Sequence, residues 1–133
     1  MIGKVIHNAL IQDTDVSALV GVRVYPIIIP EDVNSYPILT YQIQNLNSEI
    51  TKGTSITLSG NVEITCYAKK YSEIQDLVQK VIKALDRNIT TKTIDGQTVN
   101  SSTFENYSDG FEESKQLFEA NLTFYMRKPY DNE

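Results

Sequence analysis

Residues 60–87, GNVEITCYAKKYSEIQDLVQKVIKALDR, contain the pattern that decides the fold. From Leu58 to Ala68, apolar or small residues alternate with polar ones, which is the period-two pattern of a strand with one buried face. From Ile74 to Leu85, apolar residues recur three and four positions apart, which is the pattern of an amphipathic helix. The stretch therefore predicts a strand that leads directly into a helix, and the helix packs its apolar side on a sheet.

The start of this helix is predicted at Ser72. Gln75 follows three residues later, and this spacing is typical of a capping box, in which two side chains bind the amide groups that the first helical turn leaves free. The apolar stripe of the helix is the longest apolar surface in the chain, so we expect it to anchor the core. Its members are Ile74, Leu77, Val78, Val81, Ile82 and Leu85.

Two shorter helices are predicted at the N-terminal end of the sequence. Apolar residues recur at helical spacing over residues 2–10 and again over residues 16–20, with a polar break between them. Asp15 is predicted to cap the second helix, because its side chain can accept hydrogen bonds from free amide groups. Gly21 is predicted to end that helix, because glycine tolerates the positive φ angle of a helix terminus.

The next segment, Tyr25–Pro30, is an apolar arm with the sequence YPIIIP. Proline has no amide hydrogen and therefore cannot lie within a central strand. Exposed contiguous apolar surface usually marks an interface, so Tyr25, Ile27, Ile28 and Ile29 are candidate contacts with a neighbouring subunit. The alternative is that the isoleucines form an ordinary core strand, since short apolar runs are often buried.

Alternating residues predict one strand from Pro37 to Gln44 and a final strand from Phe118 to Met126. Asn45–Thr57 lies between the first of these strands and the strand that begins at Leu58. It has no apolar face, so we expect a long, mobile hairpin loop there. Its polar residues are candidates for docking a partner protein: Ser48, Glu49, Thr51, Lys52, Gly53 and Thr54.

Short turns separate the remaining segments. Asp95–Gly96 and Asp109–Gly110 are dipeptides that favour tight turns, because both residue types accept positive φ angles. Ser102–Tyr107 predicts a strand between them, and Lys128–Glu133 predicts a polar tail. The whole pattern predicts one domain over residues 1–133 of the α+β class, with an antiparallel sheet and two main helices packed on one face.

Composition narrows the classes of function. The net charge is −5, and the basic residues are scattered, which disfavours a surface that neutralises nucleic-acid phosphates. No purely apolar run is longer than three residues, as in Ile27–Ile29, which is far shorter than the roughly 20 residues of a membrane-spanning helix. No charged-then-apolar signal segment is visible, so we expect a soluble protein that stays inside the cell that makes it.

No set of residues predicts an enzyme. His7 is the only histidine and lies off the apolar stripe of its helix, which favours an ordinary surface position. Cys66 is the only cysteine and points inward in its strand, which favours packing over nucleophilic catalysis. Asp109, Glu112 and Glu113 could bind a hard cation, but a solvated turn is the stronger interpretation. We therefore expect no catalytic residue, no cofactor site and no metal site.

Several short motifs occur along the chain in a fixed order: Ala18–Gly21, Arg23–Pro26, Tyr36–Gln42, Val62–Ala68, the helix start at Tyr71–Ser72 and the aromatic C-terminal strand. In their order and spacing, these motifs resemble the tail terminator or tail completion proteins of tailed bacteriophages, which join heads to tails. The segment Thr90–Asn106 matches no part of that pattern, and the arm after Pro26 is more apolar than the resemblance implies.

The resemblance implies a structural virion protein that is assembled in the host cytoplasm. Its copies, usually six, would form a ring on the tail tube, stop polymerisation of the tube protein and dock to the head connector in the neck. DNA would pass through the ring without specific binding, which agrees with the acidic net charge. Two alternatives remain open: a free-standing α+β module that binds a ligand or peptide, and a tail-tube subunit. Mass in solution tests the first, and unlimited polymerisation tests the second.

Overall fold

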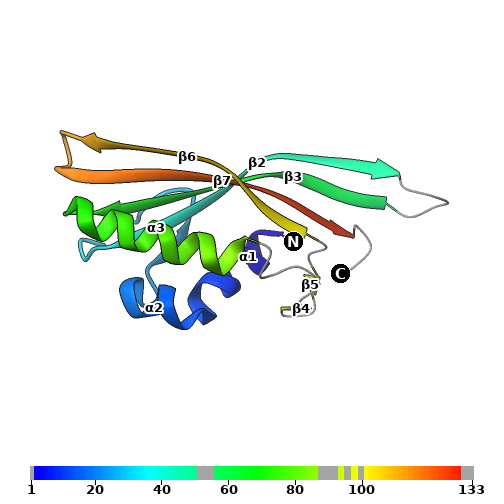
Figure 1. Ribbon diagram of the computed structural model, residues 1–133, viewed down its shortest axis with the longest axis horizontal. Helices are drawn as coiled ribbons and strands as arrows, with labels where there is room; N and C mark the ends of the chain where they lie inside the picture. The colour runs from blue at the N-terminus through cyan, green and yellow to red at the C-terminus, as the bar shows by residue number, and fades with distance from the viewer. Residues whose placement is uncertain (1, 51–55, 87–92, 95–96, 99–100, 130–133) are drawn as a thin grey trace.

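Three helices lie on one side of a five-stranded sheet in this computed structural model (Figure 1). The structure describes residues 2–50, 56–86, 93–94, 97–98 and 101–129. The helices are α1 (Ile2–Gln12), α2 (Thr14–Val20) and α3 (Tyr71–Leu85). The strands are β1 (Val24–Pro26), β2 (Ile38–Ile50), β3 (Ile56–Ala68), β4 (Thr93–Ile94), β5 (Gln97–Thr98), β6 (Ser101–Glu112) and β7 (Leu117–Pro129).

The order of strands in the main sheet is β1-β2-β3-β7-β6, so β1 and β6 are its two edges. All neighbouring pairs are antiparallel except β1 and β2, which run parallel. A parallel pair arises at this edge because the chain returns from the end of β1 to the start of β2 through the arm. The predicted α+β class is confirmed, and the helices cover one face of the sheet. The sheet is mixed rather than wholly antiparallel as predicted, because the edge strand β1 runs parallel to β2.

The predicted unit of a strand followed by a helix is confirmed as β3 and α3. Six residues of α3 are buried against the sheet, and Ile82 packs beside them half-buried. The buried residues are Ile74, Leu77, Val78, Val81, Ala84 and Leu85. Helix α3 packs on β3 and β7 and also contacts α1 and α2, so the core lies between the helices and the centre of the sheet.

The predicted capping box at Ser72 is wrong. Helix α3 begins at Tyr71, its N-cap residue is Lys70, and no side chain caps it. The amide of Gln75 does not reach back to the helix start, because its Nε2 donates a hydrogen bond of 2.8 Å to the hydroxyl of Tyr107 on β6. A tertiary contact with the sheet edge has therefore replaced a local contact within the helix.

The two predicted N-terminal helices are present, but the residue that caps the second helix is Asp13 and not Asp15. Asp13 has an extended backbone before α2, and its Oδ1 accepts a hydrogen bond of 3.0 Å from the Val16 amide. Asp15 lies inside the first turn, where its side chain cannot act as the cap. Gly21 ends the helix as predicted. Its φ is 61°, and its backbone amide donates a hydrogen bond to the Ser17 carbonyl.

The predicted loop over Asn45–Thr57 is wrong at both of its ends. Asn45–Ile50 belongs to β2 and Ile56–Thr57 to β3, and the two strands pair as far as Ile50 and Ile56. Residues 51–55 lie outside the described part of the chain. A β-bulge between Ile43 and Asn45 shifts the alternation of side chains, so Leu46 and not Asn45 packs against the core after Ile43. The regular alternation therefore ends at Gln44 although backbone pairing continues.

A second bulge lies in β6 between Phe104 and Asn106, and β6 continues past its predicted end at Tyr107 to Glu112. Asp109–Gly110 consequently lies in a strand, and the turn to β7 instead follows Glu112. Gln116 has a φ of 55° in this turn, and its backbone amide donates a hydrogen bond to the Glu113 carbonyl.

The short hairpin of β4 and β5 agrees with the prediction around Asp95–Gly96, although these two residues lie outside the described part. The final strand is confirmed as β7 and extends to Pro129. Lys128 and Pro129 therefore belong to a strand rather than to the predicted tail, and residues 130–133 are not described.

Candidate subunit and partner surfaces

Among the described residues, the large hydrophobic side chains that remain exposed lie near the two edges of the sheet. Val22, Ile27 and Ile28 flank the edge strand β1. Tyr107 and Phe111 lie on the opposite edge strand β6, and Tyr71 begins α3 beside it. Exposed apolar groups of this size favour contacts with other proteins, because removing apolar surface from water lowers the free energy. The two edges are therefore the candidate interaction surfaces.

The arm does not form a core strand. Ile27 is 63% exposed and Ile28 is 70% exposed, whereas Tyr25 and Ile29 are half-buried. Tyr25 lies in β1 opposite Thr40, so it supports the arm from the sheet. The alternative in which the isoleucines are buried within their own chain is wrong.

A strained turn presents the two isoleucines to solvent. The Ile28 amide donates a hydrogen bond of 2.7 Å to the Pro26 carbonyl, and Ile27 between them has a φ of 67°. This is a γ-turn with a positive φ, a conformation that is strained for a β-branched residue. The Ile27 amide also donates a hydrogen bond of 2.9 Å to the Tyr41 carbonyl of β2, which holds the turn against the sheet. Strain of this kind persists only where surrounding contacts enforce it, and it is concentrated at functional segments.

Arg23 anchors the base of the arm. Its Nε donates a hydrogen bond of 3.0 Å to the Pro37 carbonyl, and its guanidinium also reaches the Leu19 carbonyl at 3.3 Å. The Arg23 carbonyl accepts a hydrogen bond from the Leu39 amide. Arg23 therefore ties together the end of α2, the start of β1 and the start of β2, so the N-terminal end of the arm is fixed to the core.

The opposite edge carries an aromatic cluster, which consists of Tyr71, Tyr107, Phe111 and Phe118. The Phe118 ring lies 4.8 Å from the Phe111 ring and 5.7 Å from the Tyr71 ring, between ring centroids. Phe111 and Tyr107 pair with Phe118 and Leu122 of β7, which places them on the face of the sheet that the helices cover. The bulge in β6 puts them there, because without it their neighbours would occupy this face.

A hydrogen-bond network joins this cluster to α3. The hydroxyls of Tyr71 and Tyr107 both donate to Oδ2 of Asp109, the former at 2.8 Å. These bonds, with that from Tyr107 the stronger, lower the pKa of the Asp109 carboxyl. Partial burial, followed by the bond to Asp109, raises the pKa of Tyr107 to about 12. The edge strand is thus held to the start of α3 by an ionised carboxylate and two neutral phenols.

This network predicts a pH-dependent contribution of Asp109 to stability. Because its pKa is lowered in the folded state, its contribution is present above the unfolded carboxyl pKa of about 3.9 and is lost as pH falls through the folded value. Asp109→Asn should therefore lower the midpoint of urea unfolding at pH 7, and the difference from the wild type should vanish near pH 2. Glu105→Gln, at an exposed position on the same strand, is the control. An equal difference at both pH values would contradict this role.

Two of the predicted docking residues, Ser48 and Glu49, lie at the far end of β2, and β2 and β3 extend beyond the helices in Figure 1. Ser48 is exposed and pairs with Leu58, and Glu49 pairs with Thr57. The other four, Thr51, Lys52, Gly53 and Thr54, lie outside the described residues. Ser48 and Glu49 lie farther along β2 than Tyr41, to which the arm is hydrogen-bonded, so this described part of the predicted docking surface is separate from the arm.

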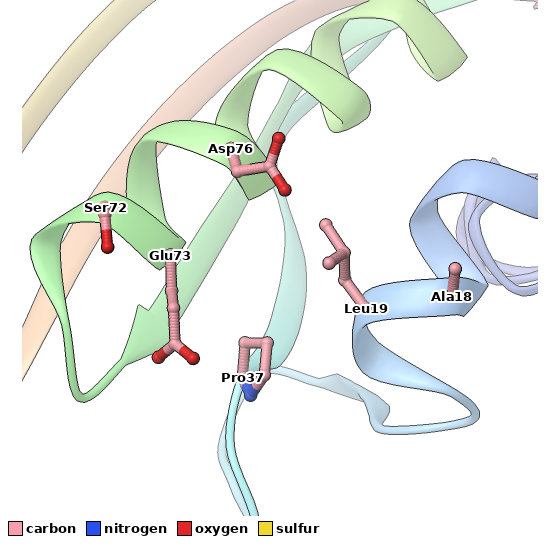
Figure 2. A pocket seen from close by; sticks show the side chains of 6 residues that line it. All are labelled: Ala18, Leu19, Pro37, Ser72, Glu73 and Asp76. Atoms are coloured by element: carbon pink, nitrogen blue, oxygen red, sulfur yellow. The ribbon is translucent and has the colours of Figure 1, made fainter.

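A shallow cleft of about 380 Å³ lies between α2 and α3. Figure 2 shows the carboxylates of Glu73 and Asp76 extending from α3 toward the apolar side chains of Leu19 and Pro37. Across the described residues, no three histidine, cysteine or acidic side chains are grouped closely enough to hold a metal ion. The cleft lacks a nucleophile paired with a base, so nothing in it supports catalysis.

Cys66 is buried and His7 is half-buried. Cys66 is fully buried in the core, and burial raises the pKa of its thiol, which disfavours the reactive thiolate. The predicted surface position of His7 is wrong, because the residue is half-buried and its ring packs 5.9 Å from the Tyr41 ring. His7 lies on the face of α1 that borders β2, which explains its burial.

A comparison with protein families matches residues 4–127 to the tail completion protein gp17 family. The chain belongs to this family. It is accordingly a structural protein of a bacteriophage tail and a component of the virion. The resemblance seen in the order of motifs along the sequence is thereby confirmed.

A solved structure supports the fold of this tail completion protein. A chain of the "Virion of native gene transfer agent (GTA) particle" is similar with a TM-score of 0.77 and 17% identity, over 93% of this chain and 91% of that one. At this identity the likeness concerns the fold alone. No curated protein matches the sequence. In the described part of the chain, none of the helices has the length and apolar character needed to cross a bilayer.

Proposed function

We propose that this tail completion protein forms a ring, in six copies, that ends the tail tube and joins it to the head connector. The observation that carries the proposal is the arm: two exposed isoleucines held by a strained turn on an edge strand. Exposure of these side chains to water does not stabilise a monomer, whereas in a ring they can form apolar contacts with the neighbouring subunit. The family assignment over residues 4–127 supports a role at this point of the tail.

The partners in this proposal are neighbouring copies, the tail-tube protein and the connector protein of the neck. The arm residues Tyr25, Ile27, Ile28 and Ile29 serve the contact between copies. Ser48 and Glu49 on β2, together with the predicted docking residues Thr51, Lys52, Gly53 and Thr54, serve the contact with the tube or connector protein. DNA passes through the ring without specific binding, which the net charge of −5 favours.

The two surfaces predict different assembly defects. Ile28→Asp places a charge where an apolar contact is proposed, so it should leave monomers in light scattering and tails of uncontrolled length in electron micrographs. Removal of residues 51–54 should leave rings that assemble normally but fail to join heads to tails. Glu31→Asp, a conservative change at an exposed position beside the arm, is the control and should assemble like the wild type.

Rings of normal size from Ile28→Asp would remove the arm from the interface. Normal joining by the shortened hairpin would place docking elsewhere on the ring. A wild-type protein that stays monomeric beside tube ends would favour a free-standing binding module, and one that polymerises without limit would favour a tail-tube subunit.

A further inference from the structure

We propose that the ring closes head to tail, with the arm of one copy packed on the aromatic cluster of the next copy. This inference rests on the proposed ring and names both halves of its interface. The first half is Ile27 and Ile28 on the β1 edge, and the second is formed by the cluster residues Tyr71, Tyr107 and Phe111 on the β6 edge. The occupant of each surface is therefore a second copy of this chain.

Strand register places the two halves at the same level of the sheet. Reading the pairings across the five strands gives one continuous row, so the end of β1 and the middle of β6 lie at opposite ends of a single line. The residues of this row are Pro26, Tyr41, Ile64, Leu122 and Tyr107. The Ile27 amide donates a hydrogen bond to the Tyr41 carbonyl, which keeps the arm at the level of this row.

The shared level of arm and cluster meets one condition that separates a ring from a helical filament. A contact between two different surfaces of the same protein repeats from copy to copy, and it closes only if each copy returns to the same height. An offset along the strand direction would accumulate into an open helix. Because arm and cluster lie on one row, copies placed edge to edge have no such offset, and the contact meets this condition for a closed ring.

The chemistry of the two surfaces is complementary. The arm offers branched aliphatic side chains, and the cluster offers aromatic rings, one of which, Phe111, is 46% exposed. Pairs of aromatic and β-branched residues stabilise neighbouring strands more than small pairs do. The network around Asp109 holds the two tyrosines in place before association, so little conformational entropy is lost when the arm binds. Edge strand β6 is also protected from indiscriminate pairing when a neighbour covers it.

Mixing two monomeric variants tests the head-to-tail arrangement without any other virion protein. Ile28→Asp retains its aromatic cluster, and Phe111→Asp retains its arm, so each variant alone should stay monomeric at 15.0 kDa. Mixed together, they should form a 1:1 heterodimer and nothing larger, because one interface is intact and the next is blocked at both ends. Circular dichroism spectra that match the wild type show that both variants fold.

The outcomes separate the inference from the proposed function. Rings formed by Phe111→Asp alone, or no heterodimer in the mixture, would overturn the head-to-tail contact even if wild-type rings still cap tails. A heterodimer combined with wild-type rings that do not bind tube ends would overturn the proposed function and support the contact.

Engineered cysteines give a second readout within the assembled ring. The variant with both Ile28→Cys and Tyr107→Cys should form intermolecular disulfides and migrate as a ladder of oligomers under non-reducing conditions. The control combines Ile28→Cys with Thr103→Cys, an exposed position on the same edge strand whose partner Tyr125 lies on the opposite face of the sheet. Equal cross-linking by the control, or dimers from Ile28→Cys alone, would refute the proposed pairing.

Discussion

Gly60→Ala is expected to destabilise the protein by about 3 kcal/mol, at the upper end of the range for overpacked sites. A Cβ atom at this position would lie 1.6 Å from the Asn45 carbonyl oxygen and 2.7 Å from the Asn45 carbonyl carbon. Both atoms belong to backbone, so no side-chain rotation relieves the clash. The bulge in β2 brings the two strands this close, and only glycine fits opposite it.

Gly110→Ala is the matched control. Gly110 also lies within a strand, but a Cβ atom there would meet no atom within 4 Å. Urea unfolding monitored by circular dichroism should show a large loss of stability for Gly60→Ala and a change below about 1 kcal/mol for Gly110→Ala. Similar midpoints for the two variants would mean that the bulge relaxes without cost, and the close approach of β2 and β3 would not matter for stability.

Val81→Asp is expected to cost more than about 4 kcal/mol, which is enough to unfold a domain of ordinary stability. Val81 is fully buried in the middle of the stripe that α3 packs on the sheet. A carboxylate there would lose its hydration without gaining a partner, or it would have to take up a proton. The variant should lack a cooperative thermal transition in circular dichroism.

Two further variants separate charge from volume and from helix propensity. Val81→Ala removes buried atoms but adds no charge, so its cost should be about 2 kcal/mol. Gln79→Asp introduces the same side chain on the exposed side of the same helix and should change stability by less than about 0.5 kcal/mol. If Val81→Asp unfolded at the same temperature as Gln79→Asp, α3 would not be the anchor of the core.

The candidate surfaces could be predicted only in part. Pro26 and Pro30 mark the arm in the sequence, because they exclude it from a central strand. Its exposure could not be deduced, since an apolar run of three residues reads equally well as a core strand. The aromatic cluster was not anticipated at all: Tyr107 and Phe111 are separated from Tyr71 by more than thirty positions, and their network with Asp109 exists only after α3 packs beside β6.

What the sequence determined by itself is the local order of elements. The alternation that ends at Ala68 and the stripe that begins at Ile74 specify β3 and α3, because each pattern depends only on residues a few positions apart. The tertiary structure decided the register. The bulges after Ile43 and Phe104 depend on contacts between strands that are distant in the chain, as the approach of Asn45 to Gly60 shows. Each bulge inserts one residue into its strand, which exchanges the faces of all residues that follow. The bulge in β6 thereby turns Tyr107 and Phe111 toward the helix-covered face.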